Sequence, residues 1–453
     1  MNRRNFLSAS GLITGSALLG ATTGVNAQIL NQSKNVKKWR LAMVGTGARG
    51  TSMWGKDVLA TYSDHVEFVG LCDINEGRVK LAKEIIKTDC PGYTDFEKMM
   101  HETKPDALIV TTVDSTHHDY IVRALELGVY PISEKPMSTD AAKIQQILDA
   151  EKQTGGNCRV TFNLRYAPLC IKIWQLLREN AIGKLTSVDL HWYLDTSHGA
   201  EYFRRWHRLV EKSGSLWVHK ASHHFDLLNW WIDSDPEEVF ALGGLEHYGK
   251  SGPFHATNCR TCNHIEQCKF YMDITKKEDL KRMYVDNEKY DGYLRDGCVF
   301  KDDVNIDDTM AATIKYANGV RVAYSLTTYS PYEGFRVSFN GTNGKIDTWV
   351  QSSNRTSDVD YDEIVICNNF GKRKYVQIPF GTSGHWGADR PLKDQVFLPN
   401  IPDPNQQCAG SRDGAFACLI GIAARQSIAT GNVVKIADLT TLKPEVKKEY
   451  KRV

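Results

Sequence analysis

KWRLAMVGTGARGTSMWGKDVLATYSDHVEFVGLCD, residues 38–73, carries the most informative pattern in this chain. An apolar run at 41–44 leads into a glycine turn at 45–50, and a second apolar run at 66–71 ends at Asp73. The order of strand, glycine turn, helix, strand and acid is that of a dinucleotide-binding unit. It predicts a βαβ unit at the start of a parallel sheet.

Each residue of the glycine turn has a physical reason. Gly45 permits the tight turn, Gly47 lets the backbone approach a pyrophosphate, and Gly50 lets the helix and strand pack closely. Arg49 lies in the same turn, beside the helix N-terminus whose free N–H groups face the phosphates. Asp73 follows Gly50 by 23 residues, where its carboxylate can accept hydrogen bonds from a ribose 2′-OH and repel a 2′-phosphate. The sequence therefore predicts NAD rather than NADP.

The first 27 residues form the second informative feature. Twin arginines, Arg3 and Arg4, precede an uncharged small and apolar run, which ends at a small-residue cleavage site, Val25-Asn26-Ala27. This pattern is typical of a Tat-type export signal, with a signal anchor as the alternative. We expect a signal peptide at 1–27, a linker at 28–38, a periplasmic location and no stable membrane span.

Export has a consequence for a dinucleotide-binding protein. The Tat pathway moves folded proteins, and free NAD is scarce outside the cytoplasm. We therefore expect the chain to load NAD before export, to bind it tightly, and to regenerate it within each catalytic cycle or pass electrons to a second substrate.

Composition favours a soluble enzyme. The formal net charge is +2 and no long basic block occurs, which argues against nucleic acid as a partner. Ten tryptophans are present, and five of them lie within forty residues: Trp192, Trp206, Trp217, Trp230 and Trp231. Their rings are equally well explained by stacking on sugars and by an ordinary hydrophobic core.

The order of apolar runs predicts an α/β protein with two domains. Residues 39–160 alternate short strands with helices, as in a doubly wound parallel Rossmann sheet. Residues 161–435 contain longer strand-like runs, which predict an α+β domain with a mostly antiparallel open sheet. Hairpin turns are expected at 317–319 and 342–344, an amphipathic helix at 410–431, and a tail at 436–453.

Two further motifs carry a family resemblance. Ser133-Glu134-Lys135-Pro136-Met137 follows an apolar strand, and SGSLWVHKASHHFDL occupies 213–227. With the glycine turn, they resemble the Gfo/Idh/MocA family of sugar oxidoreductases, over residues 39 to about 435. The stretch 112–117 resembles the family's T-P-x-x-x-H loop, with Val113 in place of proline. Residues 163–166 resemble the opening of its second domain, and residues 341–344 resemble its G-T-x-G turn.

The resemblance implies roles for individual residues. Lys135 would hydrogen-bond the reacting hydroxyl and stabilise negative charge or relay a proton, with Glu134 fixing it. His223 is the candidate acid or base, and Asp226 would orient it or serve packing. The other implied contacts are Thr112 and His117 for the cofactor, and Arg165, Tyr166, Trp206 and His223 for the substrate.

The chain departs from the family pattern at His219, where an aspartate is usual. Lys220 follows directly, so the acid or base is His223, His219 or Lys220. His219 and His223 are also spaced for a shared metal ion, and His224 is expected to point away from His223.

Four of the eleven cysteines form a group: Cys259, Cys262, Cys268 and Cys298. This spacing is typical of a structural metal site, with zinc the favoured ion, while two disulfides would suit an exported protein. Either arrangement would pin an insertion at about 247–305. Free thiols are the third possibility.

Three functions remain open. The first is an exported NAD-dependent oxidoreductase that acts on a secondary hydroxyl, at C3, of a sugar or glycoside. The second, suggested by resemblance to NAD-dependent glycoside hydrolases of family 109, is an α-N-acetylgalactosaminidase-like activity that uses oxidation, elimination, hydration and reduction. It needs a further base, for which Tyr193 and Tyr202 are candidates. The third is a non-catalytic, NAD-bound sugar sensor. The resemblance also suggests a homo-oligomer.

Overall fold

The glycine turn follows β1, an inner strand of a seven-stranded sheet. The computed structural model describes residues 38–354, 359–381 and 384–446, so the predicted signal peptide lies outside the described residues. The strand order is β15-β6-β5-β4-β1-β2-β3, in which the chain winds outward from β1 in one direction and from β4 in the other. This is the predicted doubly wound sheet. Ligands bind such a sheet where the winding direction reverses, which is between β1 and β4 here.

The strands of this sheet are β1 (Trp39–Val44), β2 (Val66–Cys72), β3 (Gly92–Tyr93), β4 (Ala107–Val110), β5 (Tyr130–Ser133), β6 (Arg159–Val160) and the antiparallel edge strand β15 (Ala409–Gly410). A π-helical segment (Gly50–Lys56) follows the turn, and the helices are α1 (Asp57–Tyr62), α2 (Glu76–Ile86), α3 (Phe96–Thr103), α4 (His117–Glu126) and α5 (Ala141–Thr154). The helix that the sequence predicts after the glycine turn therefore begins with a π-helical segment.

The second sheet has nine strands in the order β14-β13-β12-β11-β7-β10-β9-β8-β16. They are β7 (Leu185–Asp195), β8 (Pro236–Gly244), β9 (Thr309–Tyr316), β10 (Arg321–Ser330), β11 (Gly334–Gly341), β12 (Gly344–Gln351), β13 (Tyr361–Asn368), β14 (Arg373–Pro379) and β16 (Val434–Lys435). Neighbours pair antiparallel except β7 and β10, which are parallel. The expected hairpins join β9 to β10 and β11 to β12.

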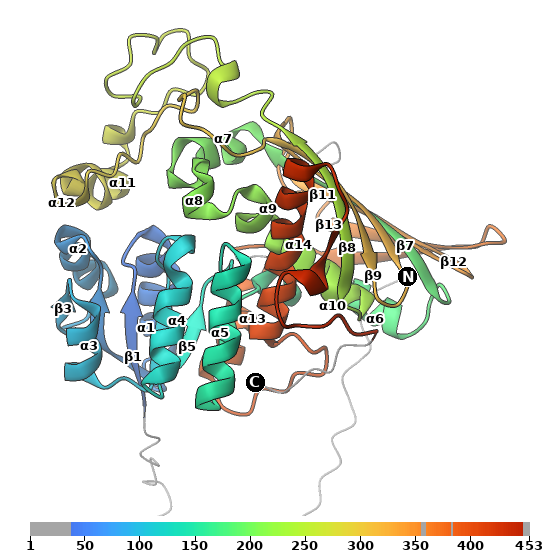
Figure 1. Cartoon of the computed structure of the whole chain (residues 1–453), viewed down its shortest axis with the longest axis horizontal. Helices are drawn as coiled ribbons and strands as arrows, with labels where there is room; N and C mark the ends of the chain where they lie inside the picture. Colours follow the sequence, from blue (N-terminus) through green and yellow to red (C-terminus); the bar gives the residue numbers. More distant parts are fainter. Residues whose placement is uncertain (1–37, 355–358, 382–383, 447–453) are drawn as a thin grey trace, which may run out of the picture. The chain divides into compact units, whose positions relative to one another are not determined.

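The remaining helices are α6 (Pro168–Arg178), α7 (Thr196–Arg204), α8 (Val210–Ser213), α9 (Leu216–His219), α10 (Ala221–Ile232), α11 (Glu278–Met283), α12 (Glu288–Asp291), α13 (Asp389–Phe397) and α14 (Ser411–Thr430). Figure 1 shows α14 between the large sheet and α5. Because α14 packs on α5, α9, α10 and β8, it is buried over most of its surface rather than amphipathic as predicted.

Helix α10 carries the candidate site residues His223 and Asp226. All twelve of its residues are buried, and it packs on α6, α9 and α14.

Among the described residues, no helix is long and apolar enough to cross a bilayer.

Candidate active site

The glycine turn is shaped by close backbone contacts. Gly45 has φ +93°, and a Cβ there would lie 2.5 Å from the carbonyl carbon of Thr111. A Cβ on Gly50 would lie 2.2 Å from the Gly45 oxygen, so neither position accepts a side chain. A Cβ on Gly47 would have the Tyr284 hydroxyl as its nearest neighbour, 3.7 Å away. The turn therefore leaves open space at the glycine expected to face a pyrophosphate.

Asp73 ends β2 beside this turn. Its Oδ2 accepts a hydrogen bond from the Thr46 amide at 2.8 Å, and its Oδ1 accepts one from Arg78 Nη2 at 3.1 Å. Arg78 also pairs with Asp291 at 2.5 Å. Two carboxylates around one guanidinium leave a net negative charge, which suits a ribose hydroxyl better than a 2′-phosphate.

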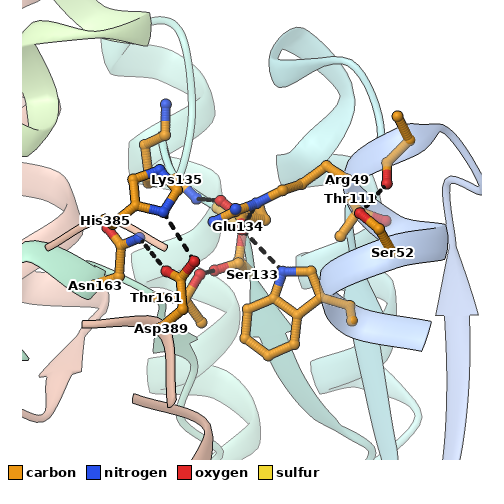
Figure 2. Close-up of polar contacts among 12 residues, drawn as sticks. Arg49, Ser52, Thr111, Ser133, Glu134, Lys135, Thr161, Asn163, His385 and Asp389 are labelled. Atoms are coloured by element: carbon orange, nitrogen blue, oxygen red, sulfur yellow. Dashed lines mark hydrogen bonds and ion pairs between the residues drawn. The ribbon is translucent and has the colours of Figure 1, made fainter. Parts of the chain in front are cut away.

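Glu134 connects the turn to the end of β5 (Figure 2). Its Oε1 accepts hydrogen bonds from Arg49 Nε at 2.6 Å and from Trp54 Nε1 at 2.8 Å. Burial acts to raise the pKa of Glu134, but Arg49 and Lys135 outweigh it and lower that pKa. The carboxylate therefore stays charged, and its Oε2 accepts the Lys135 amide at 3.1 Å.

The 112–117 loop is tied to the Glu134–Pro136 segment by His117. Its two ring nitrogens lie 2.8 Å from the Pro136 oxygen and 3.2 Å from the Thr112 oxygen. Burial lowers the pKa of His117 against the opposing effect of these two carbonyl oxygens. A neutral ring donates to one of the two oxygens and lies beside the other.

Lys135 reaches from the nucleotide sheet to α9. Its Nζ donates to the backbone oxygen of His219 at 2.9 Å. Burial lowers the pKa of Lys135 to about 8, against the opposing effect of Asp114 and Glu134. An amine with this pKa can gain or lose a proton near neutral pH.

His219 forms a pair with Asp114, which the sequence analysis did not single out. His219 Nδ1 lies 2.5 Å from Asp114 Oδ2. Burial raises the pKa of Asp114 and lowers that of His219, which drives both toward their neutral forms. A proton can therefore pass between the two atoms without a change in net charge.

His223 and His224 occupy adjacent positions of α10 but have different surroundings. His223 Nδ1 is buried and has no hydrogen-bond partner among the described residues. His224 Nδ1 lies 2.8 Å from the Tyr324 hydroxyl, and its ring stacks on Trp192 at 3.7 Å. Burial lowers the pKa of both histidines. Burial also lowers the pKa of Lys220. The Nζ atom of Lys220 lies 5.7 Å from the centre of the Trp192 ring.

Tyr202 lies at the centre of a polar chain beside His219. The two rings are 5.4 Å apart, and the Tyr202 hydroxyl lies 2.9 Å from His198 Nε2. The other nitrogen of His198 lies 3.0 Å from Glu333. This chain gives a buried phenol a route for its proton. The other tyrosine candidate, Tyr193, instead packs on Tyr332.

A second histidine–carboxylate pair lies near Lys135. Figure 2 shows His385 and Asn163 directed at Asp389, at 2.9 Å and 2.7 Å. His385 and Trp386 both have positive φ, +52° and +55°, an uncommon conformation for non-glycine residues. This loop was not predicted, because no periodicity or motif marks it.

Arg165, Tyr166 and Asp226 have the contacts of structural residues. Arg165 is fully buried and pairs with Asp226 at 2.6 Å and Asp413 at 3.0 Å. Tyr166 is buried, with its hydroxyl accepting from Arg159 at 2.8 Å. Asp226 is thus held by Arg165.

Four of the five clustered tryptophans belong to the core: Trp192, Trp217, Trp230 and Trp231. Trp206 is half-buried, stacks on His207 at 3.7 Å and meets His219 edge-on at 5.8 Å. It is thus the member of this group best placed to meet a ligand.

The sequence analysis missed several residues of this region. Asp114 could have been recognised, because it lies in the quoted 112–117 stretch directly after a strand of the parallel sheet. Tyr284 and Glu333 had no signal, since they reach the region only through tertiary packing.

The sequence predicts metal ligands at the four clustered cysteines and at the His219–His223 pair. The four cysteines line one common pocket, and the structure assigns all of them as free thiols. Across the described ranges, no set of three or more His, Cys, Asp or Glu side chains is arranged to hold a metal ion. His219 and His223 therefore gain no support as a metal pair.

Two family models match the chain. Residues 39–162 match an oxidoreductase family, NAD-binding Rossmann fold, and residues 175–436 match the C-terminal alpha/beta domain of the same family. The Bacillus subtilis (strain 168) protein YteT, named as an oxidoreductase, is 34% identical over 419 residues, which cover 88% of this chain and 98% of YteT. Glycosyl hydrolase family 109 protein 1 of Akkermansia muciniphila is 26% identical over 162 residues, 34% of this chain and 33% of that protein.

Solved structures share the fold. A myo-inositol 2-dehydrogenase from Lactobacillus plantarum has a TM-score of 0.59 at 18% identity, covering 88% of this chain and 99% of its own. An oxidoreductase from Agrobacterium radiobacter in complex with NAD+, L-tartaric acid and magnesium has a TM-score of 0.60 at 14% identity, covering 89% and 99%.

Proposed function

Because this chain belongs to the Gfo/Idh/MocA family of oxidoreductases, we propose that it is an exported NAD-dependent enzyme acting on a secondary hydroxyl, at C3, of a sugar or glycoside. The observation that carries the proposal is Lys135, an amine with a pKa of about 8 that lies between the nucleotide sheet and the His219–Asp114 pair. A group that titrates near neutral pH, next to a second proton-sharing pair, suits alcohol oxidation.

The turn and Asp73 fit NAD. The open space at Gly47 accommodates a pyrophosphate, and the negative charge around Asp73 and Asp291 favours a free ribose hydroxyl. When bound, NAD would accept or return a hydride. The protein supplies position and proton transfer.

Proton transfer falls to Lys135, with His219 and His223 next to it. Lys135 would take the hydroxyl proton as a neutral amine or stabilise an alkoxide as an ammonium. His223 Nδ1, which has no partner among the described residues, is available to a substrate oxygen. Trp206 and Lys220 are the proposed sugar contacts.

A specific observation favours glycoside hydrolysis as a second candidate. Elimination requires a base at C2, and Tyr202, which contacts Glu333 through His198, is the tyrosine beside His219 that could serve. Burial and Glu333 raise the pKa of Tyr202, so the phenol can act as a base only while His198 takes its proton. A family 109 relative aligns with part of this chain. An α-N-acetylgalactosaminidase-like cycle would also leave the cofactor oxidised after each turnover, as a periplasmic enzyme without free NAD requires.

Tight cofactor binding and a homo-oligomer complete the proposal. The twin-arginine segment supports export of the folded, NAD-loaded protein. Strands of the large sheet alternate buried and exposed residues, and its exposed face carries Leu242 and Trp349. That face is the proposed contact between subunits.

The test is a glycoside screen on purified protein, read at 340 nm and by product analysis. A dehydrogenase gives reduced cofactor and a keto sugar. A hydrolase releases the aglycone without net reduction, and Tyr202→Phe stops that release. Bound glycoside with neither product would contradict both and favour the sugar sensor.

A further inference from the structure

Four cysteines of the 247–305 insertion line one small cavity that oxidoreductase chemistry does not use. Cys259, Cys262, Cys268 and Cys298 line this cavity together with Arg204. Cys259 and Cys298 are buried and the other two are half-buried. The chain thus gathers four thiols, from positions spanning forty residues, around one cavity.

N–H donors surround the sulfurs. Hydrogen bonds of 3.1 to 3.4 Å run to Cys259 from the Arg204 guanidinium, to Cys262 from the His264 amide, and to Cys298 from the Phe300 amide. Such donors stabilise a thiolate more than a thiol. The rest of the pocket wall is mostly apolar and aromatic, with Arg204 and Asn258 as its other polar members.

The four thiols supply the sulfur ligands that a closed metal site needs. A divalent ion would deprotonate them and make use of the surrounding N–H donors. The buried Arg204 offsets part of the charge of a four-thiolate centre.

The same insertion continues to the nucleotide turn. Residues 278–291, here called the nucleotide clasp, carry α11 and α12, which lie next to α2 (Figure 1). The Tyr284 hydroxyl accepts the Ala48 amide of the glycine turn at 3.1 Å, and Asp291 pairs with Arg78. Short helical segments make up most of the clasp, which packs on Leu81 of α2 through Met283 and Tyr284.

Arg260 connects the cysteine segment to the clasp. It pairs with Glu288 of the clasp and with Asp296, while Arg204 donates to the Gly297 and Phe270 oxygens beside the pocket. A rigid pocket would therefore hold the clasp at Glu288.

We propose that Cys259, Cys262, Cys268 and Cys298 bind one Zn²⁺ ion, and that this ion fixes the clasp over the glycine turn. Zinc suits four sulfur ligands in a closed site and needs no redox partner. Binding would release four thiol protons to solvent. The thiols must rotate toward a common centre, since within the described ranges they are not yet arranged as a metal site.

The metal is tested on the full exported chain, purified without chelators. Mass spectrometry of the elements should find about one zinc per chain, and a mercurial reagent should release it from the unmutated protein. Cys262→Ser and Cys298→Ser should each lose the zinc, whereas Cys367→Ser, on the remote strand β13, should keep it. Iron with visible absorbance, a disulfide among the four, or a zinc-free protein with four reactive thiols would each overturn the site.

The clasp role rests on the proposed NAD function and has a separate readout. Loss of zinc in Cys298→Ser should raise the dissociation rate of bound NAD about tenfold, or about 1.4 kcal/mol, with no change in Cys367→Ser. Zinc loss with an unchanged dissociation rate would overturn the clasp role while leaving the metal site intact. A protein that holds zinc but never binds NAD would instead contradict the proposed function.

Discussion

At the scale of single residues, Lys135 makes the sharpest prediction. Because burial lowers its pKa to about 8, the neutral amine is the minor form below pH 8 and the major form above it. We expect kcat/KM for alcohol oxidation to rise with pH and level off above about 8. Lys135→Ala should lower it by roughly a thousandfold while NAD remains bound. A flat pH profile, or an alanine variant with most of its activity, would contradict this role.

Asp114 is expected to act through its two neighbours. Asp114→Asn removes the proton-sharing partner of His219, so we expect kcat/KM to fall on the order of 100-fold. The carboxylate also raises the pKa of Lys135, and its loss should move the pH limb to lower pH. A purely structural role would reduce activity without moving that limb, so pH profiles of the two proteins decide between them.

At the scale of elements, Arg165 connects three segments that are distant in sequence. It lies in the turn at 163–166 and pairs with Asp226 of α10 and Asp413 of α14. Arg165→Met should destabilise the protein by about 3–5 kcal/mol, because two buried carboxylates lose their guanidinium. Urea unfolding measures this, and the exposed Arg321→Met should change stability by less than about 0.5 kcal/mol. Equal stability of the two variants would refute the structural role of Arg165.

The elements also show how far the sequence could predict the structure. The βαβ order, the two hairpins and the long C-terminal helix were confirmed, because apolar periodicity and glycine turns are local signals. Five strands were missed. Strands β3, β15 and β16 have two residues each and exist only through their neighbours. Strands β13 and β14 are longer but lie at one edge of the large sheet, where most residues of β14 are exposed and weaken the alternation of buried and exposed residues. The role of Asp114 became visible only when its strand end met α9, and Glu333 and Tyr284 likewise depend on long-range packing.

At the scale of the whole molecule, the insertion contributes to the tight NAD binding that we propose. The clasp contacts the turn through Tyr284 and α2 through Asp291, so the exit path of NAD involves the insertion as well as the Rossmann sheet. We therefore expect protein from the periplasm to carry about one NAD per chain through gel filtration.

Gly47→Ala is the matched test, because its Cβ meets only the Tyr284 hydroxyl, at 3.7 Å. It should leave the melting temperature unchanged yet lower the NAD content at least tenfold, since the methyl group takes the space of the pyrophosphate. Gly50→Ala, whose Cβ meets a backbone oxygen at 2.2 Å, should lower the melting temperature instead. If Gly47→Ala retains a full complement of NAD, the nucleotide does not lie against this turn.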